Sequence, residues 1–163
     1  MPRLKKGSKQ HARPTEESRA ISFGPLPGYL GYQIRQAQAA VFRNLMASIT
    51  DLELTPGEYS LLTMLDENPG ISQVDLVAVY HLDKSTLSLA VGRLVKRGLV
   101  RRTRSRDDER YYALWLEQPG RVLLQRVRAR VEAQERTMDA ALRRGECKLL
   151  LDMLERVTQA LNR

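Results

Sequence analysis

The chain has 163 residues, which is long enough for one domain with a hydrophobic core and too short for two ordinary globular domains. Its net charge of +8 favours nucleic acid or another anionic partner. No apolar run approaches the roughly 18 residues of a membrane span, and no apolar segment lies near the N-terminus. We therefore expect a cytoplasmic protein with neither a membrane partner nor a secretory signal peptide.

The cysteine and histidine content argues against a metal centre. The single cysteine, Cys147, cannot form an internal disulfide, and together with His11 and His81 it makes a poor set of metal ligands. We expect Cys147 to be a partly buried helix residue, and we expect no metal site and no cofactor.

Residues 1–24 differ in composition from the rest of the chain. They contain six lysines and arginines, two glutamates and few apolar side chains, which predicts a disordered basic N-terminal arm. Such an arm can contact DNA phosphates, but a solvated tail without a function is equally consistent with this composition. Residues 25–163 are expected to form a single domain.

Two helices are predicted after the arm. An apolar stripe with steps of three and four residues predicts a long helix from about Leu26 to about Thr50. The stripe consists of Leu30, Ile34, Ala37, Val41 and Leu45. Thr55, followed by Pro56 and then by Glu58, is typical of a second helix start, because this capping box satisfies amide groups that the first turn leaves unpaired. The core-facing residues of this second helix are expected to be Leu61, Leu62 and Leu65.

A third, short helix is predicted to begin at Ser72, and a fourth is predicted between its cap Asp83 and Gly98. The apolar residues of the third helix are Val74, Leu76, Val77 and Val79. The fourth helix has an apolar face, which consists of Leu87, Val91, Leu94 and Val95. Its opposite face is small and polar, and consists of Lys84, Ser85, Ser88, Leu89, Gly92, Arg93 and Lys96.

The remainder of the chain predicts a hairpin and two more helices. Leu99–Thr103 and Tyr111–Leu116 are rich enough in β-formers to pair as two strands. Pro119 and Gly120 are expected to break the pattern before a long helix with Val122, Leu123, Val127 and Val131 on its apolar face. After Gly145, a last helix carries Leu150, Leu154, Val157 and Leu161. Because a small central module cannot cover the apolar stripes of three long helices, we predict a homodimer.

The order of these elements indicates DNA binding. Residues 84–110 carry nine lysines and arginines against three acidic residues, a net charge of +6. A capped helix with a small polar face suits the major groove, and a basic hairpin beside it can place an arginine in the minor groove. Arg110, held by Asp108, is the natural pair for that role. Further phosphate contacts are expected from Lys84, Arg101, Arg102 and Arg106.

Two alternatives stay open on the residues alone. The basic hairpin is also consistent with a solvated surface, and a winged helix can serve as a protein-interaction module without specific DNA binding. An enzyme is not expected, because the chain has no glycine-rich phosphate loop, no metal-ligand spacing and no paired nucleophile and base. No catalytic residue is therefore assigned.

Three segments resemble the MarR family of bacterial winged-helix regulators: L-T-P-G-E-Y-S-L-L, D-K-S-T-L-S-L-A-V-G-R-L-V-K-R-G-L-V-R-R, and D-D-E-R before a strand. The resemblance runs from about Leu26 to the C-terminus. It implies a mainly α (α+β) fold, in which a winged helix-turn-helix module with a two-stranded wing, residues 52–118, is flanked by dimerisation helices in residues 25–50 and 119–163.

The resemblance also implies functions for individual residues. By position, Ser85, Thr86, Ser88 and Arg93 match the recognition-helix residues, and Asp108 and Arg110 match the D-x-R of the wing. Such proteins are typically homodimers that bind palindromic operators in double-stranded DNA and are released by a small ligand, often an aromatic acid or a phenolic compound. Ser105 and Arg106 replace the acid and proline common ahead of the wing tip, which adds positive charge there.

A candidate effector site involves the first two predicted helices. The residues expected to line a cleft there are Tyr29, Tyr32, Arg35, Gln36 and Tyr59. Together they would supply aromatic faces and one cation, which could pair with a carboxylate or with the phosphates of a CoA thioester. The run L-G-Y-Q-I-R-Q-A-Q resembles regulators of aromatic-acid catabolism, some of which respond to aromatic acyl-CoA esters. In the alternative interpretation these tyrosines pack the junction of the two helices and Arg35 pairs with an acid.

Overall fold

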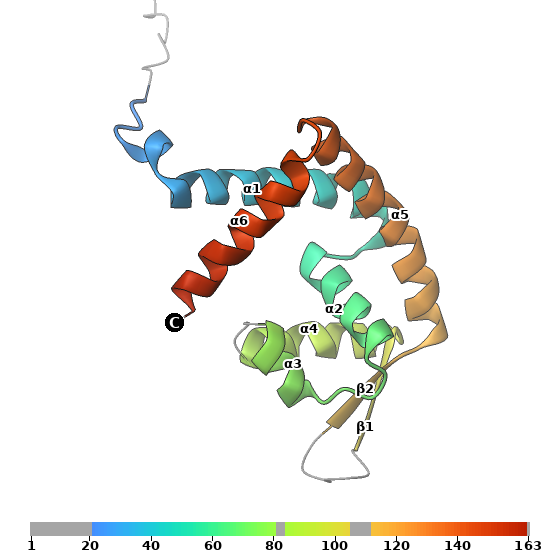
Figure 1. Cartoon of the computed structure of the whole chain (residues 1–163). Coiled ribbons are helices and arrows are strands. Elements are labelled where there is room, and N and C mark those ends of the chain that lie inside the picture. The colour runs from blue at the N-terminus through green and yellow to red at the C-terminus, as the bar shows by residue number, and fades with distance from the viewer. Residues whose placement is uncertain (1–20, 81–83, 105–111, 163) are drawn as a thin grey trace, which may run out of the picture. The chain divides into compact units, whose positions relative to one another are not determined.

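The computed structural model describes residues 21–80, 84–104 and 112–162. Most of these residues are helical, and one two-stranded antiparallel sheet is present among them (Figure 1). The α-helices are α1 (Leu30–Ile49), α2 (Pro56–Glu67), α3 (Gln73–Tyr80), α4 (Lys84–Lys96), α5 (Gln118–Ala140) and α6 (Glu146–Leu161), and the strands are β1 (Val100–Arg104) and β2 (Tyr112–Leu116). The predicted fold class is confirmed. None of the helices in the described ranges is long and apolar enough to span a bilayer.

The chain divides into two compact units, residues 1–36 and 37–163. In the first unit, a short 3-10 helix, Leu26–Gly28, precedes α1. The side-chain amide of Gln33 donates to the Pro27 carbonyl at 2.6 Å, and the rings of Phe23 and Tyr32 lie 6.4 Å apart. Residues 1–20 of the predicted arm lie outside the described residues.

The second unit contains the hydrophobic core. Its fully buried side chains come from the end of α1, from α2, α3 and α4, from β2, and from α5; the largest of them are Ile49, Leu61, Leu62, Leu65, Leu76, Leu87, Leu94, Leu114 and Leu124. The three leucines predicted for the core of the second helix are all among them. The core therefore joins α2, α3 and α4 to the hairpin and to α5.

Caps predicted from the sequence fix the ends of α2 and α3. Thr55 Oγ1 accepts from the Glu58 amide at 3.2 Å, and Glu58 Oε2 accepts from the Thr55 amide at 3.0 Å, so the capping box is complete. At α3, Ser72 Oγ accepts from the Asp75 amide at 3.1 Å. These contacts set the two helix starts at the predicted residues.

The hairpin pairs β1 with β2 from Val100 opposite Leu116 to Arg104 opposite Tyr112. The segment that precedes α3 is joined to β2, since Gly70 and Ile71 exchange backbone hydrogen bonds with Leu114. Gly70 has φ +84°, and a Cβ there would lie 2.9 Å from Cζ2 of Trp115, so both the backbone and the space require glycine. This contact anchors the hairpin to the helix-turn-helix.

The start of α5 differs from the prediction. Pro119 lies in the first turn of the helix, where its missing N–H costs nothing, and Gly120 is a helical residue packed on the hairpin. A Cβ at Gly120 would collide with the Leu99 carbonyl and lie 2.6 Å from Cδ1 of Leu116. The Pro-Gly pair therefore begins α5 rather than breaking the chain before it.

Several apolar residues of the predicted helices are exposed. Val122 of α5 is 49% exposed, whereas its neighbour Leu124 is 1% exposed. Val74 and Val79 of α3 are 49% and 62% exposed, and Val95 of α4 is 38% exposed. Periodicity indicates the apolar stripe of each helix, but the neighbouring elements decide which edge of that stripe is covered.

Helix α5 is tied to the end of α1 and to the turn after it. Arg130 forms an ion pair with Asp51 and also donates to the Ser48 carbonyl. The buried Gln134 donates to the Val41 carbonyl at 2.8 Å and to Asn44 Oδ1 at 3.0 Å. The long helices of the second unit are thus joined by polar contacts as well as by the core.

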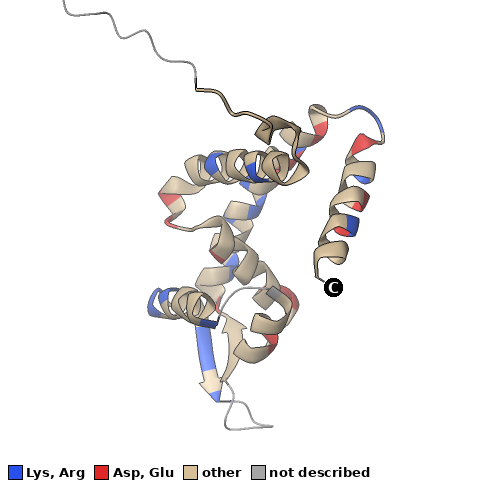
Figure 2. Ribbon diagram, turned by 90° about the vertical axis from the view of Figure 1, so that its left-hand side faces the viewer, with Lys and Arg blue, Asp and Glu red and all other residues tan. Residues whose placement is uncertain are grey.

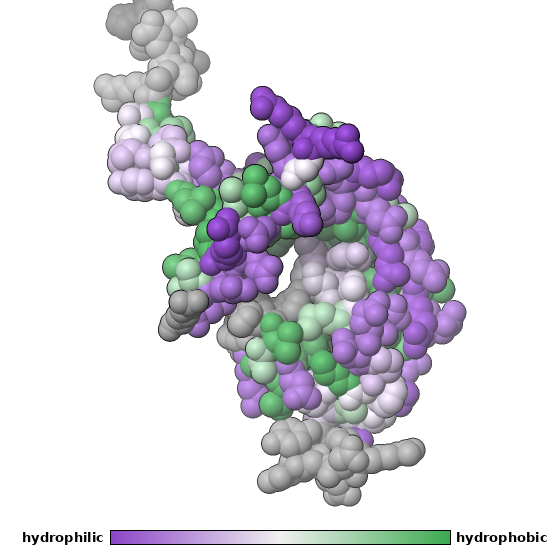
Figure 3. Space-filling model, in the orientation of Figure 1, coloured by the Kyte–Doolittle hydropathy of each residue, from purple (hydrophilic) through white to green (hydrophobic). Residues whose placement is uncertain are grey.

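Helix α6 begins after Gly145, which has φ +86° and separates it from α5 as predicted. None of the residues of α6, all of which the structure describes, is buried. Six large apolar side chains are 39–81% exposed, and Val157 is half-buried; the six are Leu149, Leu150, Leu151, Met153, Leu154 and Leu161. Figure 3 shows hydrophobic side chains among charged ones over this helix. The apolar stripe predicted for the last helix is present, and it lies at the surface of the chain.

Candidate nucleic-acid interface

Helix α4 carries the predicted recognition residues on its exposed face. Lys84, Ser85, Thr86, Ser88 and Arg93 are all exposed, while Leu87, Val91 and Leu94 hold the other face in the core. Ser85, Thr86 and Ser88, which follow Lys84 near the start of the helix, have short side chains, so the helix backbone can approach a partner closely. This is the property that a helix needs in the major groove of DNA.

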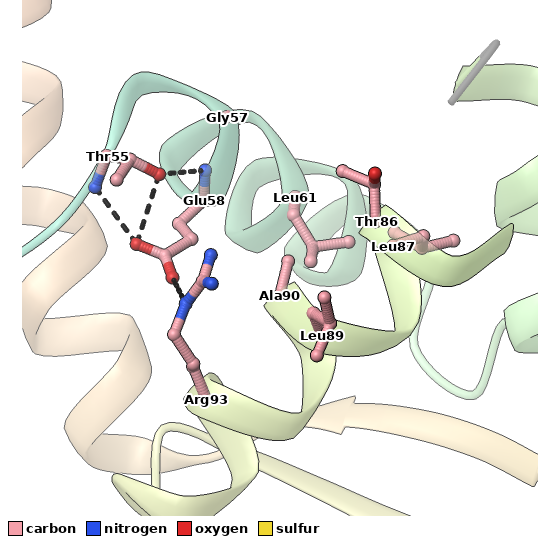
Figure 4. A pocket seen from close by; sticks show the side chains of 9 residues that line it. All are labelled: Thr55, Gly57, Glu58, Leu61, Thr86, Leu87, Leu89, Ala90 and Arg93. Atoms are coloured by element: carbon pink, nitrogen blue, oxygen red, sulfur yellow. Dashed lines mark hydrogen bonds and ion pairs between the residues drawn. The ribbon is translucent and has the colours of Figure 1, made fainter. Parts of the chain in front are cut away.

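An ion pair that the sequence did not reveal fixes α4 against α2. Arg93 Nε donates to Glu58 Oε1 at 2.9 Å, and Glu58, which is only 4% exposed, uses its other oxygen in the capping box with Thr55 (Figure 4). Burial raises the pKa of the Glu58 carboxyl, but the hydrogen bonds from Thr55 and Arg93 outweigh it, and the pKa lies below its ordinary value. The carboxylate is therefore charged at neutral pH.

A groove of about 270 Å³ lies between the start of α2 and the exposed side of α4 (Figure 4). Glu58 and Arg93 lie on its wall, and Leu61, Thr86, Leu89 and Ala90 contribute apolar surface. Arg93 was predicted as a DNA contact from the sequence. Its guanidinium in this structure bonds to Glu58, while its side chain stays 60% exposed.

The basic side chains of β1 alternate between two environments. Arg101 donates to Glu117 at 2.6 Å, and its guanidinium lies 5.6 Å from the centre of the Trp115 ring. Arg102, the next residue, lies with its guanidinium 4.0 Å from the centre of the Tyr112 ring. Since successive side chains of a strand point to opposite faces, the two arginines serve different surfaces of the hairpin.

Arg102 shares a second groove with α3 and α4. This groove, of about 390 Å³, is lined by Gln73, Val74, Val77, Lys84, Ser88, Arg102 and Tyr112. Two predicted phosphate contacts, Lys84 and Arg102, and one predicted recognition residue, Ser88, are therefore brought together. Figure 2 shows that lysines and arginines follow β1 and continue onto the neighbouring helix. The arrangement can hold an anionic backbone beside the exposed face of α4.

Part of the predicted interface lies outside the described residues. This applies to Arg106, Asp108 and Arg110 at the wing tip, and to the helix cap Asp83. The minor-groove contact of Arg110 stays a prediction.

The candidate effector residues belong to the two different compact units of the chain. In the first unit, Tyr29 and Arg35 are exposed, and the side-chain amide of Gln36 donates to the Tyr32 hydroxyl at 3.0 Å. In the second unit, Tyr59 packs half-buried against the core. The cleft that these residues were predicted to line stays a prediction.

Cys147 is partly buried at the start of α6, as predicted. Burial, together with the neighbouring Asp139, raises the pKa of its thiol, which disfavours the reactive thiolate. Within the described ranges, no three histidine, cysteine or acidic side chains are grouped so as to hold a metal ion.

Sequence reasoning missed the residues that support the interface. The capping box was visible as Thr55-Pro56-x-Glu58, but the partner of Glu58 lies 35 residues further on, so no local signal revealed it. The aromatic supports of the wing, Trp115 and Tyr112, had a weak signal: each lies on a strand that pairs with a basic one. Cross-strand pairing of aromatic and basic residues could have suggested them.

Comparison with known proteins extends over most of the chain. Residues 54–112 match the model of the MarR family. A putative transcriptional regulatory protein for the hcr operon of Thauera aromatica is 33% identical over 151 residues, which cover 91% of this chain and 91% of that protein.

Solved structures agree with this match. The transcriptional repressor CouR bound to a 23-mer DNA duplex has a TM-score of 0.79 and 31% identity, covering 85% of this chain and 99% of CouR. CouR bound to p-coumaroyl-CoA has a TM-score of 0.78 and 30% identity, with 85% and 98% covered.

Proposed function

The chain belongs to the MarR family of transcriptional regulators, and on that premise we propose that it is a repressor which binds a palindromic operator as a homodimer and releases it when a small ligand binds. The observation that carries the proposal is the exposed, short-side-chain face of α4, flanked by the cations of β1. A helix of this kind enters the major groove, and the wing beside it enters the minor groove.

Phosphate contacts come from the groove that Lys84 and Arg102 share. Ser85, Thr86 and Ser88 face the bases, Arg106 adds a phosphate contact at the wing tip, and Arg110, held by Asp108, enters the minor groove. Arg101 was predicted for the same phosphate role. Its ion pair with Glu117 favours a supporting role at the base of the wing.

The homodimer is supported by α6. A 16-residue helix with a largely exposed apolar stripe is marginal in water on its own and gains stability from a second apolar surface. A second copy of the chain supplies that surface, and its α4 then contacts a second half-site about one helical turn, roughly 34–36 Å, away.

The effector is an aromatic acid or an aromatic acyl-CoA ester, bound by Tyr29, Tyr32, Arg35, Gln36 and Tyr59. Support comes from the likeness to CouR in complex with p-coumaroyl-CoA and from the chemistry of the residues. Tyrosine rings stack on an aromatic acyl group, and one arginine pairs with a carboxylate or a phosphate.

Selection of genomic fragments by the purified protein, followed by gel-shift titration over a range of salt concentrations, tests DNA recognition. A specific operator whose affinity falls steeply with salt is expected. Replacing Arg110 with alanine should weaken operator binding by about 1–3 kcal/mol. Weak, salt-insensitive binding to every duplex would instead favour a protein-interaction module.

Thermal unfolding in the presence of phenolic acids and their CoA esters tests the effector. A ligand that binds only the folded protein at 100 times its Kd stabilises it by about 2.7 kcal/mol, which is a measurable rise in Tm. The stabilising compound should also release the operator. If no member of either class shifts Tm, the proposed effector class is wrong, although the DNA-binding function is unaffected.

A further inference from the structure

Leu89 is out of place on the exposed face of α4. It is 67% exposed, which makes it the most exposed large apolar side chain of that helix. Its neighbours on the same face, at helical spacings of four, one and three residues, are Ser85, Ser88 and Gly92, and all three are exposed. Leucine is thus the only long apolar side chain among short ones on this face of the helix.

An exposed leucine on its own is unremarkable, because apolar atoms make up much of any protein surface. The surroundings of Leu89 make it informative. Lys84 and Lys96 are exposed on the same helix, and Arg102 lies in the adjoining groove, so the surface is cationic and suits a polyanion rather than an apolar protein partner. The partner must therefore be anionic overall and still offer an apolar group to Leu89.

Duplex DNA has one such group in the major groove. Among the base edges exposed there, the C5-methyl group of thymine is apolar, while the others present hydrogen-bond donors and acceptors. Because Ser85, Ser88 and Gly92 are short, the backbone of α4 can come close to the bases, and the four-carbon side chain of Leu89 then projects beyond them. Leu89 lines the α2–α4 groove beside Thr86 and Ala90, so the apolar surface continues past it (Figure 4).

We infer that Leu89 determines operator specificity by contacting the C5-methyl group of one thymine in each half-site. The inference rests on the proposed function, because it requires α4 to lie in the major groove. It adds a base preference that serine and threonine hydroxyls do not supply, since these pair with either donors or acceptors.

The test uses the full-length protein and the operator obtained by selection. Each thymine of the half-site is replaced in turn by deoxyuridine, which removes the methyl group and leaves base pairing unchanged. At one position the wild-type affinity should fall about fourfold per half-site, or about 15-fold when both half-sites are changed, as expected for losing one buried methyl group.

The Leu89→Ala variant completes the cycle. It should bind the thymine operator about fourfold per half-site more weakly than wild type, and should bind the deoxyuridine operator with nearly the same affinity as the thymine operator. Val122→Ala, a change at an exposed valine of α5, is the matched control and should respond to deoxyuridine as the wild type does. Circular dichroism checks that both variants fold.

Three outcomes would overturn the inference. If no deoxyuridine substitution weakens wild-type binding, no thymine methyl group is contacted, although the protein still recognises its operator. If one position is sensitive to the same extent in wild type and in Leu89→Ala, a different side chain contacts the methyl group. If no specific operator exists, the proposed function fails and the inference fails with it.

Discussion

Glu58 offers the sharpest test of how α4 is held in place. The residue is 4% exposed, and the two oxygens of its carboxylate are divided between two partners. Oε2 accepts from the Thr55 amide at 3.0 Å and from the Thr55 hydroxyl at 3.1 Å, and Oε1 accepts from Arg93 Nε at 2.9 Å. Glu58→Gln keeps the shape of the side chain but leaves one acceptor oxygen and one amide donor, so only one of the two partners can be satisfied.

The expected loss follows from these contacts. A hydrogen bond to a charged group contributes about 1.5–3 kcal/mol, and we expect the lower end because the Arg93 side chain is 60% exposed. Glu58→Gln should therefore lower the free energy of unfolding by about 1.5 kcal/mol. Glu58→Ala loses the helix cap as well, which adds about 1 kcal/mol, and should cost about 2.5–3 kcal/mol in all.

Urea unfolding followed by circular dichroism measures this difference. The protein concentration must be equal in all samples, since the stability of the proposed homodimer would depend on concentration. Asp152→Asn is the matched control: Asp152 pairs with Arg156 at 3.2 Å, but both side chains are at least 60% exposed, so its loss should cost less than about 0.5 kcal/mol. If Glu58→Gln and Asp152→Asn are equally stable, the buried carboxylate does not hold α4.

The same variant predicts a pH effect with a definite sign. The pKa of Glu58 is lower in the folded protein than in the unfolded chain. The carboxylate therefore contributes stability above its ordinary pKa of about 4.3, and this contribution is lost as the pH falls through the folded value. Glu58→Gln should remove that part of the acid dependence, and a variant that keeps the full wild-type acid dependence would contradict this account.

Three further predictions concern other contacts. Gly120→Ala should destabilise the fold by about 1–3 kcal/mol, because the added Cβ overlaps the hairpin. Gly92→Ala should stabilise α4 by up to about 1 kcal/mol, because a Cβ there meets nothing within 4 Å. Equal effects of the two variants on the free energy of unfolding in urea would contradict this packing. Arg102→Ala should lower the salt slope of operator binding by about 1, while Arg101→Ala should leave it close to wild type, and gel-shift titration distinguishes the two. The hydrogen bond from Arg130 lowers the pKa of Asp51, so the stability that the Asp51 carboxylate contributes is lost as the pH falls through that lowered pKa. Asp51→Asn should therefore lose less stability in acid than the wild type, and the free energy of unfolding measured over a range of acidic pH tests this.

Local signals in the sequence were sufficient to predict most of the elements. Helices α2 and α3 begin where their caps predict. These caps are the capping box of Thr55 and Glu58 and the serine cap at Ser72, and each is formed by residues close together in the sequence. Gly98 and Gly145 likewise mark helix ends, and both have positive φ. Such features depend on the nearest few residues, so they can be predicted without knowing the tertiary structure.

Features that depend on a distant partner could not be predicted. The pattern of α5 placed Val122 inside, but contact with α2 and the hairpin turns Leu124 and Gly120 inward instead. Arg93 was assigned to DNA by its match to the recognition-helix residues of the family, and Arg101 was assigned as a phosphate contact. Each has a carboxylate partner from another part of the chain. A charge pattern specifies where cations lie along the chain, but not which of them the fold has already paired.

The position of the chain's single tryptophan has a practical consequence. Trp115 donates its indole N–H to Thr103, lies beneath the guanidinium of Arg101, and packs against Gly70. All intrinsic indole emission of the protein therefore originates at the root of the wing, within a few ångströms of a charged group. Unlabelled protein thus contains its own optical probe at this point, and stopped-flow fluorescence can follow wing movement in real time without an attached dye.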